Sequence, residues 1–517
     1  MSRASSAATP RQVAVIDCGS TEVRALVAEI TGGSCRILED ISADCDLSDG
    51  FAGGTISRSV MESLVSILVD LRRVVNDYGV AEVRAVATSA LIEAANADVV
   101  IERVRMTSGF VLEVIEASRQ AEVYYQALDN LCQEQGFCLS GDVMTVDVGG
   151  GTSVVSLIRS NKLVHAIDEH FSTRRSIEAF TQEREAVEFV SAIDRFCHGV
   201  ARVMLRRLPQ VRHPSLIITG REPRHLAARL FGQEPGGRAM VAHVVDRIAD
   251  WYRVQIGMTA VERARHADSD TQEADEMLIV AALVTHLAQL TGSRRVYLPR
   301  LRLCDGLLLG FLADSRRTEV AWRRHLLAAG RQLAVRYGTP RVYANNTARL
   351  ARQIFEGTRD LHGMGLREQT LLEFAALVHD VGSHINVRAR HKHTCYILRH
   401  ADIPGLEGAE QEMVAQIARY HRRSPPQARH LEFAQLPRRQ RVVVSTLAAI
   451  LRLAYALDVE RSQRIVRVRC RLEPGLLLLQ VDRRDVTLER WSVRDKAQLF
   501  NDVFGLRVAV HPAVGEQ

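Results

Sequence analysis

Two short segments, residues 13–21 and 144–153, constrain the fold of this chain most. Each is an apolar stretch that runs into an aspartate, Asp17 or Asp147, followed by a turn of glycines and hydroxyl residues. Such a stretch predicts a buried strand that carries its aspartate to the strand's carboxyl end. Glycine lets backbone N–H groups approach an anion because no Cβ stands in the way, and hydroxyls add further donors. Each turn is therefore predicted to bind phosphate.

The predicted phosphate-binding residues fall into two matching sets. They are Gly19, Ser20 and Thr21 in the first turn, and Gly149, Gly150, Gly151, Thr152 and Ser153 in the second. Two such turns in one chain favour an actin-like phosphotransferase arrangement, in which two related α/β lobes face each other across a cleft.

The pattern of the rest of the chain divides it into four predicted domains, at residues 1–125, 126–312, 313–462 and 463–517. Strand and helix patterns alternate through the first two, which predicts an α/β fold. Long amphipathic segments with few β-branched runs start near Ser315 and predict an all-helical domain. Alternating apolar and polar residues from Ile465 predict a small α+β domain with one helix at 493–504.

The charge of the chain leaves two interpretations open. The net charge is +6, and nearly all the cations are arginines, because lysine occurs only at Lys162, Lys392 and Lys496. Arginine makes planar, bidentate contacts with phosphate, so a basic channel for a polyanion is one interpretation and a solvated arginine-rich surface is the other. Nucleic acid is disfavoured as a partner because the chain lacks aromatic stacking motifs.

The N-terminal residues and the lengths of the apolar runs indicate where in the cell the protein is expected. Residues 1–10 form a polar stub without the apolar centre of a secretory signal. No apolar run approaches the roughly 20 residues that a membrane-spanning helix needs. We therefore expect a cytoplasmic protein that does not enter a membrane.

Several motifs together resemble the exopolyphosphatase/guanosine pentaphosphate phosphohydrolase (Ppx/GppA) phosphatase family. They lie, in the family's order, at residues 17–20, 87–91, 112–121, 147–151, 372–382, 391–393, 417–423 and 451–458. The resemblance implies two actin-like, ribonuclease H-like lobes, a helical HD-like third domain and a divalent metal such as Mg²⁺. It also implies release of terminal phosphate from polyphosphate or guanosine pentaphosphate by a homodimer.

That reaction needs a metal and donors to neutralise the phosphoryl group, and a carboxylate to orient or deprotonate water. Asp147 is predicted to bind metal and position the catalytic water, and Asp17 is its metal-binding counterpart in the first lobe. The alternative for each is an aspartate that only caps its turn by accepting local N–H bonds.

The chain departs from the family pattern where the catalytic glutamate is expected. Arg119 and Gln120 stand there, and neither accepts a proton from water, because a guanidinium stays charged and an amide is not basic. The other departures are Ile92 and Cys304 in place of arginines, Val154 in place of a glutamate, and Glu22 in place of a small hydroxyl residue.

Two hypotheses follow. The first is a phosphoanhydride hydrolase with impaired turnover, in which Glu116, about one helical turn from the expected position, or Glu122 replaces the missing base. The second is a relative that binds polyphosphate or a guanosine nucleotide without hydrolysing it and acts as a regulator.

The helical domain offers a second cluster, formed by His379, Asp380, His393 and His421. It resembles an HD metal site, but no histidine occurs in the expected upstream helix around residues 343–350. The favoured interpretation is a buried hydrogen-bonded network that holds helices together, and the family resemblance implies the same structural role.

Overall fold

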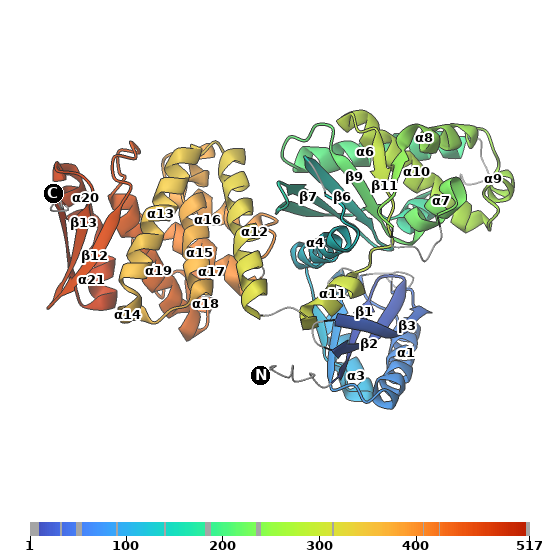
Figure 1. Ribbon diagram of the computed structural model, residues 1–517, viewed down its shortest axis with the longest axis horizontal. Coiled ribbons are helices and arrows are strands. Elements are labelled where there is room, and N and C mark those ends of the chain that lie inside the picture. The colour runs from blue at the N-terminus through green and yellow to red at the C-terminus, as the bar shows by residue number, and fades with distance from the viewer. Residues whose placement is uncertain are drawn as a thin grey trace, which may run out of the picture. The chain divides into compact units, whose positions relative to one another are not determined.

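The computed structural model describes residues 10–31, 34–47, 54–88, 91, 93–138, 141–180, 188–233, 239–312, 315–406, 408–422 and 424–512. The chain forms two compact units, Met1–Ser315 and Arg316–Gln517, which are described separately (Figure 1).

The first lobe of the first unit is built on a five-stranded sheet. Its strands are β1 (Arg11–Cys18), β2 (Glu22–Thr31), β3 (Ser34–Asp44), β4 (Glu82–Ala87) and β5 (Leu112–Val114), in the order β3-β2-β1-β4-β5. The first three are antiparallel neighbours, whereas β4 and β5 run parallel to β1. Helices α1 (Arg58–Asp77) and α3 (Ala97–Ser108) contribute apolar residues to the same core.

The second lobe repeats this topology. Its strands are β6 (Asp142–Val148), β7 (Ser153–Arg159), β8 (Leu163–Glu169), β9 (Ser215–Thr219), β10 (Ala242–Val244) and β11 (Arg295–Tyr297), in the order β10-β11-β9-β6-β7-β8. Again an antiparallel meander, β6-β7-β8, continues into strands parallel to its first member, β9 and β11. The expectation of two related α/β lobes is confirmed, and β1 and β6 are the equivalent central strands.

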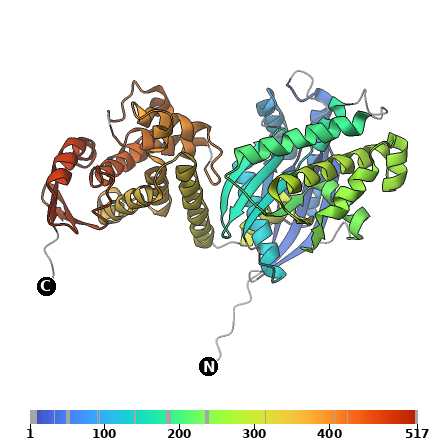
Figure 2. The same cartoon turned by 90° about the horizontal axis from the view of Figure 1, so that it is seen from above.

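Helices surround the second sheet. They are α5 (Thr173–Ala179), α6 (Glu188–Arg207), α7 (Arg221–Phe231), α8 (Val245–Val254), α9 (Ala260–Ala267) and α10 (Thr271–Thr291). Figures 1 and 2 show α6 and α10 lying side by side, and the two helices are in contact. Helix α10 corrects one prediction, because its 21 residues are long and apolar enough to cross a membrane. Its apolar window is 89% buried in this unit, as in the core helix of a globular fold.

Two helices join the lobes. Helix α4 (Ala117–Glu134) spans the predicted limit at residues 125 and 126 and packs against β7 and β8 of the second lobe. Helix α11 (Leu303–Leu312) follows the second sheet in sequence but packs on β1 and β2 of the first. The two helices also contact each other where a Cβ on Gly306 would stand 2.2 Å from the Val123 carbonyl oxygen, so only glycine fits there.

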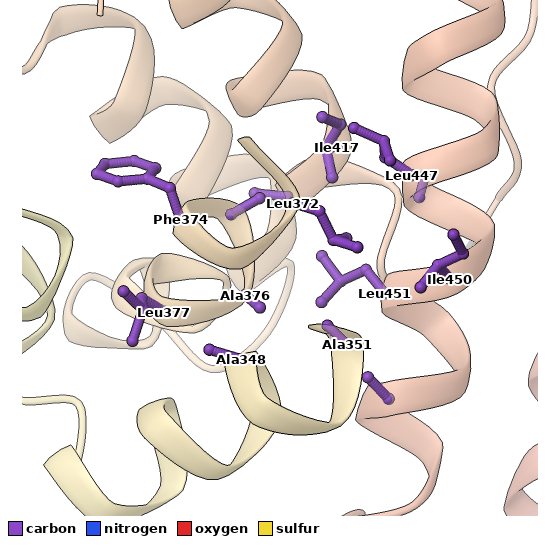
Figure 3. Close-up of a cluster of buried hydrophobic side chains, with 14 of the residues drawn as sticks. Ala348, Ala351, Leu372, Phe374, Ala376, Leu377, Ile417, Leu447, Ile450 and Leu451 are labelled. Atoms are coloured by element: carbon purple, nitrogen blue, oxygen red, sulfur yellow. The ribbon is translucent and has the colours of Figure 1, made fainter. Parts of the chain in front are cut away.

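The second unit begins with a helical core. Its helices are α12 (Ser315–Arg336), α13 (Arg341–Gly357), α14 (Arg359–His362), α15 (Leu366–Val378), α16 (Arg390–His400), α17 (Gly408–Arg419), α18 (Leu431–Gln435) and α19 (Arg438–Ala456), with a 3₁₀ turn η2 (Val381–His384). Figure 3 shows side chains from α13, α15, α17 and α19 converging, among them Ala351, Leu372, Ile417 and Leu451. This apolar core is what makes the unit compact.

A small sheet completes the second unit. Strands β12 (Val468–Glu473), β13 (Leu476–Val481) and β14 (Arg507–Pro512) lie in that order, with helices α20 (Thr487–Lys496) and α21 (Gln498–Phe504) between the last two. The single helix predicted at 493–504 is therefore two helices. Val486 occupies the N-cap of α20 and makes no side-chain cap, and the side chain that accepts a bond from the first helical N–H, that of Thr487, is Asp485 one residue earlier, so the usual N-cap signal is displaced.

Candidate active site

The two predicted phosphate turns have the same local geometry. The Gly19 N–H donates to the Glu22 carbonyl oxygen at 3.0 Å, and the Gly149 N–H donates to the Thr152 carbonyl oxygen at 3.1 Å. A Cβ on Gly149 would stand 2.6 Å from that same Thr152 oxygen, which a real Cβ never does. Each turn is therefore a tight hairpin, and in the second turn glycine is required for the close approach of backbone to backbone.

The hairpin turns of the two lobes lie against each other. A Cβ on Gly150 would be 2.2 Å from Thr21 Cγ2, and one on Gly151 would be 2.8 Å from Ser20 Oγ. These glycines thus let the second turn approach the hydroxyl side chains of the first. The predicted phosphate-binding turns converge from opposite lobes onto one place.

A cleft of about 740 Å³, counting the space open to solvent, lies at this meeting point. Asp17 and Asp147, both turns, and Gln120 and Tyr124 of α4 line it. Four arginines also line the cleft: Arg24, Arg221, Arg224 and Arg302. An anion in this space would meet backbone N–H groups, hydroxyls and guanidinium groups together.

Asp17 lies in the cleft with a buried carboxylate oxygen, Oδ1, that has no hydrogen-bond partner. Burial raises the pKa of Asp17 to about 7, with Arg24 opposing the rise and the charges of Glu22 and Asp147 adding to it. An unsatisfied buried oxygen is costly unless a ligand completes it. Asp17 therefore has the geometry expected of a carboxylate that receives a cation.

Asp147 is held more firmly. Thr219 Oγ1 donates to Asp147 Oδ1 at 2.7 Å, and Gln120 Nε2 lies 3.5 Å from Oδ2. Burial raises the pKa of Asp147, while hydrogen bonds from Thr219 and Tyr124 counteract the rise. The two side chains from α4, Gln120 and Tyr124, are one turn apart and both face this carboxylate.

The structure separates the two residues at the expected position of the family's glutamate. Gln120 faces the cleft, whereas the guanidinium of Arg119 pairs with Glu122 at 2.5 Å. Glu122 is only 3% exposed and does not line the cleft, so the ion pair accounts for its charge. An amide thus stands where the resemblance places the catalytic base.

Two predicted site residues need correction. Glu116 occupies the N-cap of α4 with an extended backbone, is exposed, and does not line the cleft. Ser153 is fully buried, and its hydroxyl donates to the Phe171 carbonyl oxygen at 2.7 Å, so it is unavailable to a phosphate. Local spacing suggested both residues, but long-range contacts place them elsewhere. Ile92 lies outside the described residues.

The other departures from the family pattern also have places in the structure. Glu22 pairs with Arg24, and this ion pair lowers the pKa of Glu22 although burial alone would raise it. The charge of Glu22 in the cleft is thus balanced by an arginine of its own strand, β2. Cys304 is fully buried in α11 and Val154 is 3% exposed in β7, so both pack as apolar side chains.

Sequence reasoning missed Glu222, an acid in the cleft. It is the second residue of helix α7, which follows β9 after Gly220, and it is 7% exposed and lines the same cleft as the two aspartates. Burial, with the nearby charge of Glu276, raises its pKa to about 7. The available signal was the apolar segment 215–220, which closes in Thr-Gly and is followed immediately by charged residues.

The histidine cluster of the second unit forms a buried network. His379 Nδ1 lies 2.7 Å from the Ala376 carbonyl oxygen and Nε2 lies 2.9 Å from the Tyr343 hydroxyl, so both ring nitrogens are engaged. Asp380 pairs with Arg390 at 3.0 Å and with Arg461 at 2.9 Å. The carboxylate of Asp380 is therefore already bound by two guanidinium groups, at the place where a metal ion would have to bind it.

His421 and His393 complete the comparison with the predicted cluster. The His421 ring lies 5.1 Å from that of His379, and burial holds the pKa of His421 well below its usual range. His393 is half-buried. The histidine whose charge acts on His421 is His391, not the predicted His393. Within the described residues, no group of three or more His, Cys, Asp or Glu side chains is arranged to hold a metal.

Comparison with known proteins identifies the chain. The model of the Ppx/GppA phosphatase family matches residues 26–196, and that of Ppx/GppA phosphatase domain III matches residues 328–494. The chain belongs to the Ppx/GppA phosphatase family. The match over residues 26–196 contains α4 and the hairpin turn of the second lobe. The match over residues 328–494 contains the buried histidine network.

Curated relatives of this Ppx/GppA member cover most of its length. The guanosine-5'-triphosphate,3'-diphosphate pyrophosphatase of Vibrio vulnificus is 21% identical over 419 residues, which are 79% of this chain and 80% of the relative. The enzyme of the same name from Aeromonas hydrophila is 22% identical over 472 residues, 87% of this chain and 88% of the relative.

Solved structures of the family share the fold. The Aquifex aeolicus member of the Ppx/GppA family has a TM-score of 0.50 and 22% identity, covering 59% of this chain and 98% of that one. An exopolyphosphatase from Cytophaga hutchinsonii also has a TM-score of 0.50, with 18% identity over 58% of this chain and 98% of its own. The actin-like lobes expected from the sequence are confirmed.

Proposed function

We propose that this Ppx/GppA member binds a phosphate chain between its two hairpin turns and hydrolyses its terminal phosphoanhydride bond slowly. The substrate is inorganic polyphosphate or guanosine pentaphosphate. One observation carries the proposal: turns from opposite lobes meet at a cleft lined by Asp17 and Asp147. Enzymes that transfer phosphoryl groups work mainly by positioning and charge stabilisation, and these elements can supply both.

The residues of the cleft fit a divalent cation such as Mg²⁺. Mg²⁺ is usually bound through one or two carboxylates, with waters and substrate phosphates completing its shell. Asp17 offers an unpartnered buried oxygen, and Asp147 lies close enough for its charge to raise the pKa of Asp17. Asp17 and Asp147 would hold the ion, which supplies charge neutralisation to the terminal phosphoryl group.

We assign proton acceptance to Glu222. Among the described acids that line the cleft, it lies outside the two hairpins, and its pKa of about 7 suits a general base at neutral pH. A carboxylate at this place accepts a proton from water only if the water lies between α7 and the bound phosphoryl group. Turnover is slow because Gln120, not a glutamate, faces Asp147 from α4.

Release of orthophosphate from long-chain polyphosphate in the presence of Mg²⁺ tests this function. Asp147→Asn and Asp17→Asn should abolish release, and Glu222→Gln should reduce it about 100-fold, the low end of what one general base contributes. Glu102→Gln, an exposed change on α3, is the matched control and should leave the rate unchanged. Equal rates for the wild type and Asp147→Asn would refute hydrolysis at this site.

A second function is favoured by the amide of Gln120. Because Gln120 donates toward Asp147 and cannot accept a proton, the same cleft can bind phosphate chains without hydrolysing them. In that case the protein is a regulatory member that responds to polyphosphate or a guanosine nucleotide. Saturable, salt-sensitive binding without phosphate release would favour this second function.

A further inference from the structure

Tyr124 of α4 forms part of the wall between the cleft and a second, apolar cavity. This cavity of about 370 Å³, counting the space open to solvent, lies between α4 and the sheet of the second lobe. Tyr124, Asp147 and Leu301 line both the cavity and the cleft. The side chain of Tyr124 therefore lies where the apolar interior of the second lobe meets the polar cleft.

The hydroxyl of Tyr124 has a specific partner. It donates a hydrogen bond to the carboxylate of Asp147. The charges of Asp17 and Arg24 also act on this phenol, so Tyr124 lies within electrostatic reach of both cleft aspartates. A tyrosine phenol keeps its proton at neutral pH and can therefore donate to a carboxylate. Tyr124 is thus an uncharged donor placed among the charged groups of the cleft.

Asp147 receives donors from two different elements. Thr219 Oγ1 of β9 donates to Asp147 Oδ1 at 2.7 Å, and the Tyr124 hydroxyl donates from α4. Gln120 Nε2 lies 3.5 Å from Oδ2, which is long for a hydrogen bond. Donors from a strand and from a helix together fix the carboxylate, because turning it would break one bond or the other. A carboxylate has about four lone-pair sites, so Asp147 keeps at least one for a cation.

We propose that Tyr124 is a positioning residue for the divalent cation, which acts through Asp147 by holding its carboxylate in the orientation that binds the ion. This inference rests on the proposed function, because it assumes a cation bound by both Asp17 and Asp147. Thr219 bonds only one oxygen of Asp147, which by itself leaves the carboxylate able to turn about that bond. Hydrogen-bond partners of metal-binding side chains typically contribute roughly tenfold to a hundredfold to metal affinity.

Binding of Mn²⁺ to the metal-free protein, followed by electron paramagnetic resonance, tests this role without turnover. Mn²⁺ prefers oxygen ligands as Mg²⁺ does, and its free and bound forms have different spectra. Tyr124→Phe removes only the hydroxyl and should weaken Mn²⁺ binding roughly tenfold to a hundredfold. In phosphate release, the same variant should need a correspondingly higher Mg²⁺ concentration for half of its maximal rate, whereas the maximal rate at saturating Mg²⁺ should change less.

Tyr125→Phe is the matched control, because Tyr125 is the next residue of α4 and its hydroxyl donates to the Asn161 carbonyl oxygen at 3.0 Å. It should bind Mn²⁺ like the wild type, and thermal unfolding should show that both variants are folded. Unchanged or tighter Mn²⁺ binding by Tyr124→Phe, together with loss of binding in Asp17→Asn, would overturn the role of Tyr124 and leave the proposed function intact. A wild type that binds no Mn²⁺ would overturn both this role and the proposed cation site.

Discussion

Gly150 of the second lobe lies so close to Thr21 of the first that a Cβ there would stand 2.2 Å from Thr21 Cγ2. The two residues come from hairpins 129 positions apart in the sequence, and their approach joins the two halves of the proposed site. This contact makes the geometry of the cleft sensitive to a single methyl group.

Gly150→Ala should therefore weaken tripolyphosphate binding about tenfold or more, because the added methyl group displaces Thr21 or separates the turns. Thr21→Ala removes the atoms that clash, so the double variant should recover part of the loss, a non-additive effect that a double-mutant cycle measures. Gly199→Ala is the control, since nothing lies within 4 Å of a Cβ on that α6 glycine. Additive effects of the two substitutions would show that the contact does not control binding.

Gln120→Glu should raise the rate of phosphate release, because it places a carboxylate toward Asp147 where the family resemblance expects the base. A positioned general base is typically worth roughly 100-fold or more. Gln133→Glu serves as the control, because Gln133 is an exposed amide on the same helix and does not line the cleft. The comparison is made by measuring orthophosphate from tripolyphosphate with Mg²⁺; equal rates for both variants would contradict the role given to position 120.

Asp17 should make the ligand-free protein less stable as the pH rises toward 8. The pKa of this carboxyl rises from 3.8 to about 7 on folding, so its stabilising contribution is present below pH 3.8 and is lost as the pH rises through about 7. Asp17→Asn removes this titration. Its free energy of unfolding should exceed that of the wild type more at pH 8 than at pH 5.

Denaturant unfolding at both pH values, without divalent cations, measures that difference. Asp246→Asn on the exposed first turn of α8 is the control and should show no such pH dependence. Saturating Mg²⁺ should reverse the trend in the wild type, because a cation binds the charged carboxylate. A stability difference that is the same at pH 5 and pH 8 would count against the buried state of Asp17.

Asp380 should act as the anion of a buried ion-pair network and not as a metal ligand. Asp380→Asn leaves Arg390 and Arg461 facing a neutral group, which should cost roughly 3 kcal/mol of unfolding free energy. Asp485→Asn, whose carboxyl is 71% exposed, should cost little. EDTA should leave the thermal unfolding of the second unit unchanged, and a large loss of stability on chelation would instead indicate a bound metal.

Much of the fold follows from the sequence because its signals are local. The aspartates at the ends of apolar strands, the glycine turns after them, and the change to amphipathic helices each depend on a few neighbouring residues. The structure and the family match confirm the two related lobes and the helical and small-sheet regions. The start of α20 escaped prediction because its N-cap position holds Val486, while the capping carboxylate of Asp485 lies one residue earlier.

The composition of the candidate site was decided by tertiary structure. Sequence spacing could not predict that Gln120 faces the cleft while Arg119 pairs with Glu122. It also could not predict that the Ser153 hydroxyl donates its hydrogen bond to the Phe171 carbonyl oxygen. Nor could sequence spacing predict that Glu222 and Arg224 line the same cleft as the hairpin turns. These outcomes depend on burial and on charges contributed by strands and helices far apart in the chain. The sequence alone therefore determined which local elements could grip phosphate, and folding decided which charges surround it.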